Sequence, residues 1–320
     1  MMQHILITAL LVISILIYFK VADRFNIIDK PNERSSHSQI TIRGGGIVFY
    51  LSALFFFVVS GFQYPWFFLG LTLIALISFL DDILTLSSKT RIIVQLISMI
   101  LLFYDVHLIT FPLWIVLIAL ILAIGIINAY NFMDGINGIT VANSLTVLIL
   151  LAISNAQINF VDQNFIYFVI ASCFVFAFFN FRVRAKTFAG DVGAVSIAFI
   201  ILFLLALLII KTENIIYLLF LVIYGVDSVL TIVWRIIKKE NIFEAHRSHL
   251  YQILKNENKS NSLLISGVYG VLQLILGFGI IYITQFSLKI QLIFAITVIL
   301  ISSLLYLYLK STLIKRYNIR

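Results

Sequence analysis

Carboxylates are scarce in this chain, with 14 Asp and Glu among 320 residues, and their positions are informative. Asp81 and Asp82 lie in FLDDILTLSSKTR, Asp134 lies in NAYNFMDGING, and Asp191 lies in FAGDVGAV. Each of these polar stretches ends or interrupts a long apolar run. A carboxylate at the middle of a bilayer costs roughly 2.5–3.5 kcal/mol on insertion scales, so we expect all four at the ends of membrane helices.

The acidic pair closes its apolar run, where acidic side chains oppose the helix dipole and lose free energy. Two solvated terminal charges are the simple alternative, but this cost favours a functional role. Consecutive helical residues point about 100° apart, so Asp81 and Asp82 cannot both face one ion and are expected to divide two tasks. Asp191, taken alone, is explained more simply as a helix N-cap.

The stretch NAYNFMDGING, residues 128–138, carries amides rather than cations. Asn, Asp and Gly form turns, and an ordinary turn would explain the two glycines. It explains less well the spacing of three between Asn128, Asn131 and Asp134, which puts them roughly on one helical face. Such a face offers the paired donors and acceptors that a base edge, a ribose or a sugar amide requires. Positive charge for a diphosphate would come from other loops.

The amino-acid composition indicates that membrane helices position these polar stretches. Apolar residues make up 62% of the chain, charged residues 11%, and the mean hydropathy is +1.10, so this is an integral membrane protein. We expect one all-α helical bundle over residues 1–320. The apolar runs predict eleven helices near residues 4–19, 47–62, 66–80, 92–104, 113–127, 139–155, 165–181, 193–210, 215–234, 263–283 and 288–309. The runs at 66–80 and 92–104 are short for a bilayer, so ten is the alternative count.

The basic residues test this helix count, because Lys and Arg gather in cytoplasmic connections. Of the 22 Lys and Arg, only Lys211 and Lys289 fall outside the alternate connections predicted for one side. The long basic loops are therefore expected to face the cytoplasm, with the N-terminus outside and the C-terminus inside. The net charge of +8 is largely this orientation signal, so no nucleic acid partner is needed.

Two further groups have competing interpretations. His246 and His249 flank Arg247 and could be a zinc pair or interfacial side chains, although the single, distant Cys173 argues against zinc. Asp227 lies well inside an apolar run and is a functional candidate for that reason. Arg235, eight residues later, is too far along the helix to pair with it. We expect Asp227 to support a neighbouring loop from below.

Taken together, these stretches resemble a known family of membrane enzymes. The motifs are KPNERSSHSQITIRGGG at 30–46, DD at 81–82, NAYNFMDGING at 128–138, AGDVGA at 189–194, DSVLTIVWR at 227–235 and HRSHLYQ at 246–252. In this order they resemble the polyprenyl-phosphate N-acetylhexosamine-1-phosphate transferases, which include phospho-MurNAc-pentapeptide transferase and the GlcNAc-1-phosphate transferases of O-antigen and teichoic acid synthesis. The HRSHLYQ form looks most like the O-antigen branch and not the triple-His form of the peptidoglycan enzyme.

The resemblance implies a reaction and its participants. Undecaprenyl phosphate would attack the β-phosphate of a UDP-N-acetyl sugar, giving a lipid diphosphate sugar and UMP at the bacterial cell membrane. The ion would be Mg²⁺, with Mn²⁺ as an alternative, and a homodimer is compatible with the family. Active-site loops are expected near residues 20–46, 80–91, 128–138, 182–192 and 235–262.

The resemblance also implies roles for individual residues. Asp191 would bind the metal, while Asp81 and Asp82 would lie near the lipid phosphate. One of the pair, not specified by the resemblance, would act as a base or positioning group, and the other would support the site electrostatically. The nucleotide sugar would be bound by Asn128, Asn131, Asp134 and Asn137, with basic groups from Arg34, Arg43, His246, Arg247 and His249. Asn137 departs from the family, since many members carry Asp there. For the first loop, which contains Arg34 and Arg43, anchoring to anionic lipid is an equal alternative.

Other functions remain to be distinguished. Within the family, transfer of phospho-MurNAc-pentapeptide is the alternative reaction. A transporter of lipid-linked sugars would also be a helical bundle with few charges. It would place polar groups near the membrane midplane, however, whereas the polar groups of this chain gather at one face.

Overall fold

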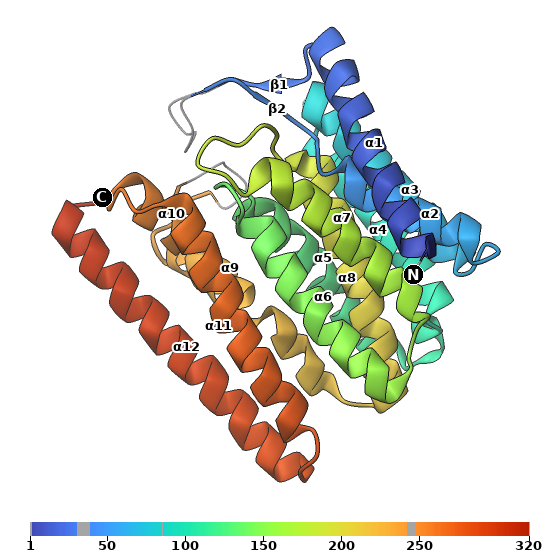
Figure 1. The fold of residues 1–320 in the computed structure, drawn as a ribbon. Helices are drawn as coiled ribbons and strands as arrows, with labels where there is room; N and C mark the ends of the chain where they lie inside the picture. Colours follow the sequence, from blue (N-terminus) through green and yellow to red (C-terminus); the bar gives the residue numbers. More distant parts are fainter. Residues whose placement is uncertain (1, 31–38, 85, 242–246, 320) are drawn as a thin grey trace.

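The computed structural model describes residues 2–30, 39–84, 86–241 and 247–319, and these residues are almost entirely helical (Figure 1). The α-helices are α1 (Met2–Arg24), α2 (Ile47–Val59), α3 (Pro65–Leu84), α4 (Ser88–Asp105), α5 (Leu113–Met133), α6 (Ile139–Ile158), α7 (Gln163–Asn180), α8 (Gly190–Thr212), α9 (Val222–Ile237), α10 (Leu250–Asn256), α11 (Ser262–Ile283) and α12 (Leu288–Tyr317). Short 3-10 helices are η1 (Leu108–Thr110) and η2 (Ile215–Leu221), and the strands are β1 (Ile28–Asp29) and β2 (Thr41–Ile42).

Each of the eleven apolar runs is helical, with η2 and α9 together forming the ninth. In the described parts of the chain, nine helical segments are long and apolar enough to cross a membrane. Helix α3 is among them with 20 residues, so this run is not short. Helix α2 has 13 residues, which is roughly 20 Å of rise against a hydrocarbon core of about 30 Å. The prediction of an all-α, multi-pass membrane protein is confirmed.

Local signals begin several of these helices. Pro65 occupies the first position of α3, where a missing backbone N–H costs nothing. The Ser87 hydroxyl accepts a hydrogen bond from Thr90 N at 3.2 Å and caps α4. The Asn261 side chain accepts one from Leu263 N at 2.8 Å and caps α11. The helix starts therefore follow from residue types that the sequence displays.

Helix α8 forms the centre of the bundle and is its most buried membrane segment among the described residues. It packs against α2, α3, α5 and α6. The Phe67 ring of α3 stacks on Phe199 and Phe203 of α8, with centroids 5.6 and 4.0 Å apart. Helices in lipid gain little from burial away from water, so close packing of this kind is a main source of their association. The start of α8, which carries Asp191, is thereby held among the helices that surround α8.

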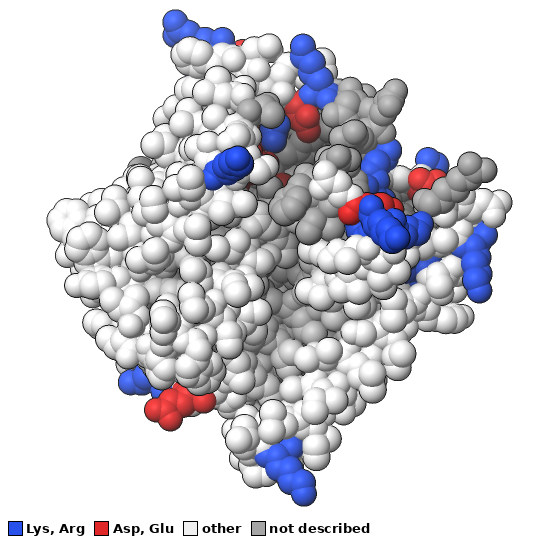
Figure 2. Space-filling view, turned by 180° about the vertical axis from the view of Figure 1, so that it is seen from behind, with Lys and Arg blue, Asp and Glu red and all other residues white. Residues whose placement is uncertain are grey.

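One end of the bundle carries most of the polar structure. The strands β1 and β2 pair antiparallel there, and α10 and the C-terminus lie at the same end (Figure 1). Most Lys and Arg side chains gather at this end with acidic side chains among them, while the opposite end carries few charges (Figure 2). Helices α3 and α5 run past their predicted ends at residues 80 and 127. The acidic pair and two of the asparagines therefore lie in final helical turns at the charged end.

Candidate active site

The side chain of Asp82 is fully buried, and it caps the start of α8 from a different helix. Its Oδ1 accepts a hydrogen bond from Asp191 N at 2.9 Å, and its Oδ2 accepts one from Val192 N at 3.1 Å. Arg43 Nε lies 2.7 Å from the same carboxylate. The Ala189 position at the N-cap has no side-chain cap, and Asp191 lies in the first turn of α8. The simple interpretation of Asp191 as an N-cap is therefore wrong, because Asp82 caps the helix instead.

Asp81 turns to a separate set of partners, as the 100° offset between neighbouring helical residues predicts. Its Oδ2 accepts a hydrogen bond from Arg91 Nη1 at 2.8 Å, and its Oδ1 accepts one from Leu86 N at 2.5 Å. Arg91 comes from the first turn of α4. Its Nη1 also lies 3.5 Å from Asp191 Oδ2, so one guanidinium joins two of the three carboxylates.

Asp191 is the most accessible carboxylate of the three, with its side chain 18% exposed against 8% for Asp81 and 0% for Asp82. Its oxygens lie 3.3 Å from Arg43 Nη2, 3.5 Å from Arg91 Nη1 and 3.4 Å from Asn131 Nδ2. Charge-assisted hydrogen bonds are usually about 2.7–2.9 Å long. These contacts are all longer, so Asp191 is held in place by its backbone and only loosely by its side chain.

The glycines at 44–46 bring Arg43 against the start of α8. Gly45 N donates to Phe188 O at 2.9 Å and Gly46 N donates to Ala189 O at 3.1 Å. A Cβ on Gly46 would collide with the backbone of Gly193. These glycines therefore serve a close approach between two loops, which a larger residue would prevent.

The burial of the first-loop cation has an electrostatic consequence. Burial would lower the pKa of Arg43, but the neighbouring carboxylates of Asp82, Asp191 and Asp29 outweigh it and raise the pKa above its usual value. The Tyr18 hydroxyl fixes the backbone by donating to Arg43 O at 2.6 Å. Arg43 therefore remains a charged partner of the acidic cluster.

Two of the predicted amide residues contact the cluster or its surroundings. Asn131 reaches Asp191 directly. Asn128 lies one turn earlier in α5, where its Nδ2 donates to Ile124 O at 2.8 Å and to Gln95 Oε1 of α4 at 3.3 Å. On this face of α5, Asn131 thus contacts the carboxylate cluster, and Asn128 links α5 to α4 through a hydrogen bond.

The other two amide-stretch residues shape the loop after α5. Asp134 Oδ1 accepts a hydrogen bond from the Thr140 hydroxyl at 2.6 Å. Burial raises the pKa of Asp134 to about 6, and Thr140 offsets part of this rise. Asn137 Nδ2 donates to Arg182 O at 2.8 Å and to Val183 O at 3.2 Å, which ties this loop to the loop between α7 and α8.

His249 is buried behind this loop. Its Nδ1 lies 3.1 Å from Asp227 Oδ1, and Leu250 N donates to the same oxygen at 3.1 Å. The ring of Tyr251 lies beside the His249 ring, and its hydroxyl donates to Phe132 O at 2.8 Å. The prediction that Asp227 supports a neighbouring loop is confirmed.

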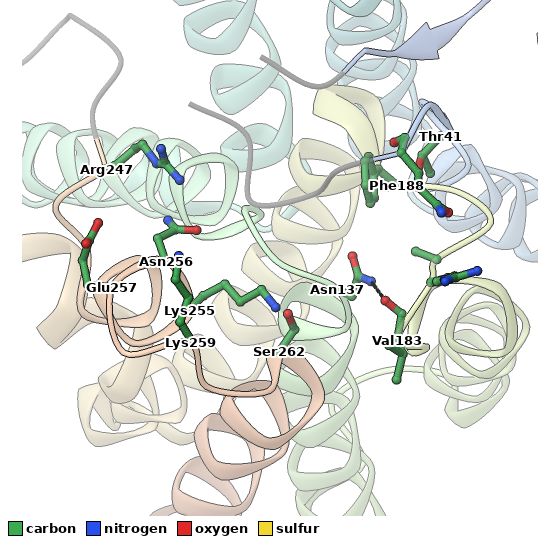
Figure 3. A pocket seen from close by; sticks show the side chains of 13 residues that line it. Thr41, Asn137, Val183, Phe188, Arg247, Lys255, Asn256, Glu257, Lys259 and Ser262 are labelled. Atoms are coloured by element: carbon green, nitrogen blue, oxygen red, sulfur yellow. Dashed lines mark hydrogen bonds between the residues drawn. The ribbon is translucent and has the colours of Figure 1, made fainter. Parts of the chain in front are cut away.

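A polar cavity of about 600 Å³ lies between loops at the charged end of the bundle (Figure 3). One wall carries Thr41, Asn137, Val183 and Phe188, and the facing wall carries Arg247, Lys255, Asn256, Glu257 and Lys259. Arg184 also lines it. Two of its lining residues are close in the chain to the acidic cluster, since Phe188 is three residues from Asp191 and Thr41 is two residues from Arg43.

The structure thus brings Asp81, Asp82, Asn131, Asp191 and Arg43 together, with Arg247 and Asn137 at the polar cavity. Predicted residues Arg34 and His246 lie outside the described residues. Sequence reasoning missed Arg91, Lys255 and Lys259 as site residues, because it used them only as orientation signals. The position of Arg91 near the start of the helix that follows the acidic pair is a signal that could have identified it.

Part of the chain matches a known family of transferases. Residues 64–212 of this chain match the family model described as glycosyl transferase family 4.

Two relatives are similar over different lengths. A probable undecaprenyl-phosphate N-acetylglucosaminyl 1-phosphate transferase of Bacillus subtilis is 26% identical over 309 residues, covering 86% of this chain and 84% of that protein. An undecaprenyl-phosphate alpha-N-acetylglucosaminyl 1-phosphate transferase of Yersinia pestis is 28% identical over 211 residues, covering 58% of this chain and 56% of that protein.

Proposed function

We propose that this protein transfers an N-acetylhexosamine 1-phosphate from a UDP-sugar to undecaprenyl phosphate in the bacterial cell membrane. A phosphate oxygen of the lipid forms a bond to the β-phosphorus of the donor. The bond from that phosphorus to the bridging oxygen breaks, and UMP leaves with the electron pair. The products are undecaprenyl diphosphate sugar and UMP, and the product begins an O-antigen or another envelope polysaccharide.

The observation that carries this proposal is the meeting of three carboxylates and two guanidinium groups at one end of the bundle, which also has a basic cavity. A lipid acceptor and a water-soluble donor can meet only at a membrane surface. The names of both relatives include undecaprenyl phosphate and 1-phosphate transfer. The basic loops favour the cytoplasmic surface, with the N-terminus outside.

Asp191 has the properties of a magnesium ligand. Mg²⁺ is usually held by one or two carboxylates, with water and substrate phosphates completing its coordination. Asp191 offers a partly exposed carboxylate with only long contacts, and Asp81 lies close by. When bound, the ion would neutralise charge on the diphosphate.

The protein residues then divide the remaining work. Asp82 positions the start of α8, since both of its oxygens are occupied by backbone N–H groups. Asp81 orients Arg91, and Arg91 and Arg43 offer guanidinium N–H groups to phosphoryl oxygens, for which Arg geometry is well suited. Phosphoryl transfer depends chiefly on such positioning and charge neutralisation.

The basic cavity is suited to the donor. Its cations Arg184, Arg247, Lys255 and Lys259 complement a nucleoside diphosphate, and the amides of Asn137 and Asn256 offer donors and acceptors for sugar or base. A volume of about 600 Å³ is within the range of small-molecule sites.

The test is a panel of UDP-sugars offered to the purified enzyme with undecaprenyl phosphate and Mg²⁺. The proposal expects UMP release that requires both substrates and one or more UDP-N-acetylhexosamines. Release only with UDP-MurNAc-pentapeptide would assign the alternative reaction. Absence of UMP with every donor would overturn the proposal.

A further inference from the structure

Lys310 is a buried lysine in a helix that is otherwise largely exposed. Only 3% of it is exposed, whereas Lys315 on the same helix is exposed. An ammonium group has three donors and no acceptor, and its burial is costly unless those donors find oxygens. Lys310 Nζ donates to Tyr306 OH at 2.8 Å and to Thr231 Oγ1 at 3.2 Å. The lysine therefore joins α12 to α9.

The contacts of Lys310 determine which groups donate and which accept in the neighbouring hydrogen bonds. Because lysine can only donate, the oxygens of Tyr306 and Thr231 accept from it, and their own hydrogens point elsewhere. Tyr306 OH lies 2.6 Å from Thr231 Oγ1, and Thr231 Oγ1 donates to Asp227 Oδ1 at 3.3 Å. The Thr231 hydrogen thus faces Asp227, and the Tyr306 hydrogen is left to face Thr231 or Asp227. The chain of donors ends on a carboxylate.

Asp227 connects these hydrogen bonds to the loop that precedes α10. It is 1% exposed, and its Oδ2 accepts from the Tyr269 hydroxyl at 2.8 Å. Its Oδ1 receives Leu250 N and faces His249 Nδ1, each at 3.1 Å. An ionised carboxylate can only accept, so the imidazole carries a hydrogen on Nδ1. Pairing of this kind fixes both the tautomer and the orientation of a histidine ring.

The loop held in this way borders the proposed donor cavity. At the start of α10, Gln252 Oε1 accepts a hydrogen bond from His249 N at 3.2 Å. Arg247 lies two residues before His249, and Lys255 lies on α10, and both line the cavity. Tyr251 contacts the amide stretch through Phe132 O. A change in the orientation of this loop would therefore move cations on one wall of the cavity.

We propose that Lys310 of the C-terminal helix is a positioning residue for the donor cavity, acting through Tyr306, Thr231 and Asp227 on the loop that carries His249. The inference rests on the proposed function, because it assigns the cavity to the UDP-sugar. The C-terminal helix then has a role in donor binding, although Lys310 itself does not line the cavity.

Kinetics with both substrates test this role. Lys310→Met removes the donors, Tyr306→Phe removes one hydroxyl and keeps the ring, and Lys315→Met is the matched control on the exposed face of α12. We expect the first two to raise the KM for the UDP-sugar, Lys310→Met by about tenfold, which corresponds to about 1.4 kcal/mol. The KM for undecaprenyl phosphate should not change, and Lys310→Arg should recover much of the donor affinity. Equal changes for both substrates, or none, would overturn the inference.

A second measurement does not depend on activity. With Cys173 replaced by Ser, Ser248→Cys reports the loop through its rate of labelling by a thiol reagent in opened membranes. Lys310→Met and Tyr306→Phe should raise this rate, and Lys315→Met should not. An unchanged rate contradicts the link from α12 to the loop. A raised rate in a protein that releases no UMP supports the link and rejects the proposed function instead.

Discussion

Replacing Asp82 by Ala should destabilise the protein, whereas replacing Asp191 by Ala should not. Asp82 accepts two backbone hydrogen bonds at the start of α8 and contacts Arg43 at 2.7 Å. Loss of a helix cap costs about 0.5–2 kcal/mol, and breaking a buried ion pair costs about 3–5 kcal/mol. Arg43 is 34% exposed and can recover some hydration, so the sum is reduced to about 2–4 kcal/mol.

The two variants differ because Asp191 makes only long side-chain contacts and lies beside two other carboxylates. Its removal relieves like-charge repulsion at little cost. The assay is thermal unfolding of the purified protein in detergent, with exposed Asp23→Asn as the control. Asp82→Ala should lower the Tm by roughly 4–10 °C, by scaling from soluble domains. If Asp82→Ala has the Tm of the wild type while Asp191→Ala has a lower Tm, the assignment of capping to Asp82 is refuted.

Four further results are expected. Asp191→Ala should abolish Mg²⁺-dependent transfer in a folded protein, and near-normal turnover would count against Asp191 as the metal ligand. Asn131→Ala should impair use of the donor more than use of the lipid acceptor, as measured by the two KM values; equal losses would indicate a purely structural role. Cysteine at Ser87, in a protein with Cys173→Ser, should react with an impermeant thiol reagent only after cell lysis, and labelling of intact cells would reverse the orientation. Burial raises the pKa of Asp134 from 3.8 to about 6, so this carboxyl binds a proton more tightly in the folded protein than in the unfolded chain. The free energy of unfolding should therefore fall as pH rises from about 4 to about 6. Asp134→Asn should flatten this dependence in unfolding measurements, and an unaltered slope would exclude Asp134 as its source.

The sequence predicted the helices well, because membrane spans depend on composition over long windows. That Asp81 and Asp82 contact different groups was also predictable, since it follows from helical geometry alone. The supporting role of Asp227 could be inferred for a similar reason. A carboxylate inside an apolar run must find donors, and the next polar loop supplies them.

Other features depend on contacts between distant segments. Asp191 looks like an N-cap in its local sequence, but the capping carboxylate comes from a residue 109 positions earlier. The glycines at 44–46 could be explained only by their approach to the start of α8. Arg91 contributes to the same charge pattern as the other basic residues and could not be separated from them by counting. Lys310 appeared as a terminal charge of the last helix, and only tertiary packing revealed its burial.

The central claim is that a sugar and its attached phosphate move together from donor to lipid. A UDP-N-acetylhexosamine accepted by the enzyme and labelled with ³²P at the β-phosphate tests it most directly. The account predicts that the label enters the lipid fraction with the sugar, in equal amount to the UMP released, and that Asp191→Ala blocks this transfer. Label that remains in UDP while sugar alone enters the lipid would contradict it.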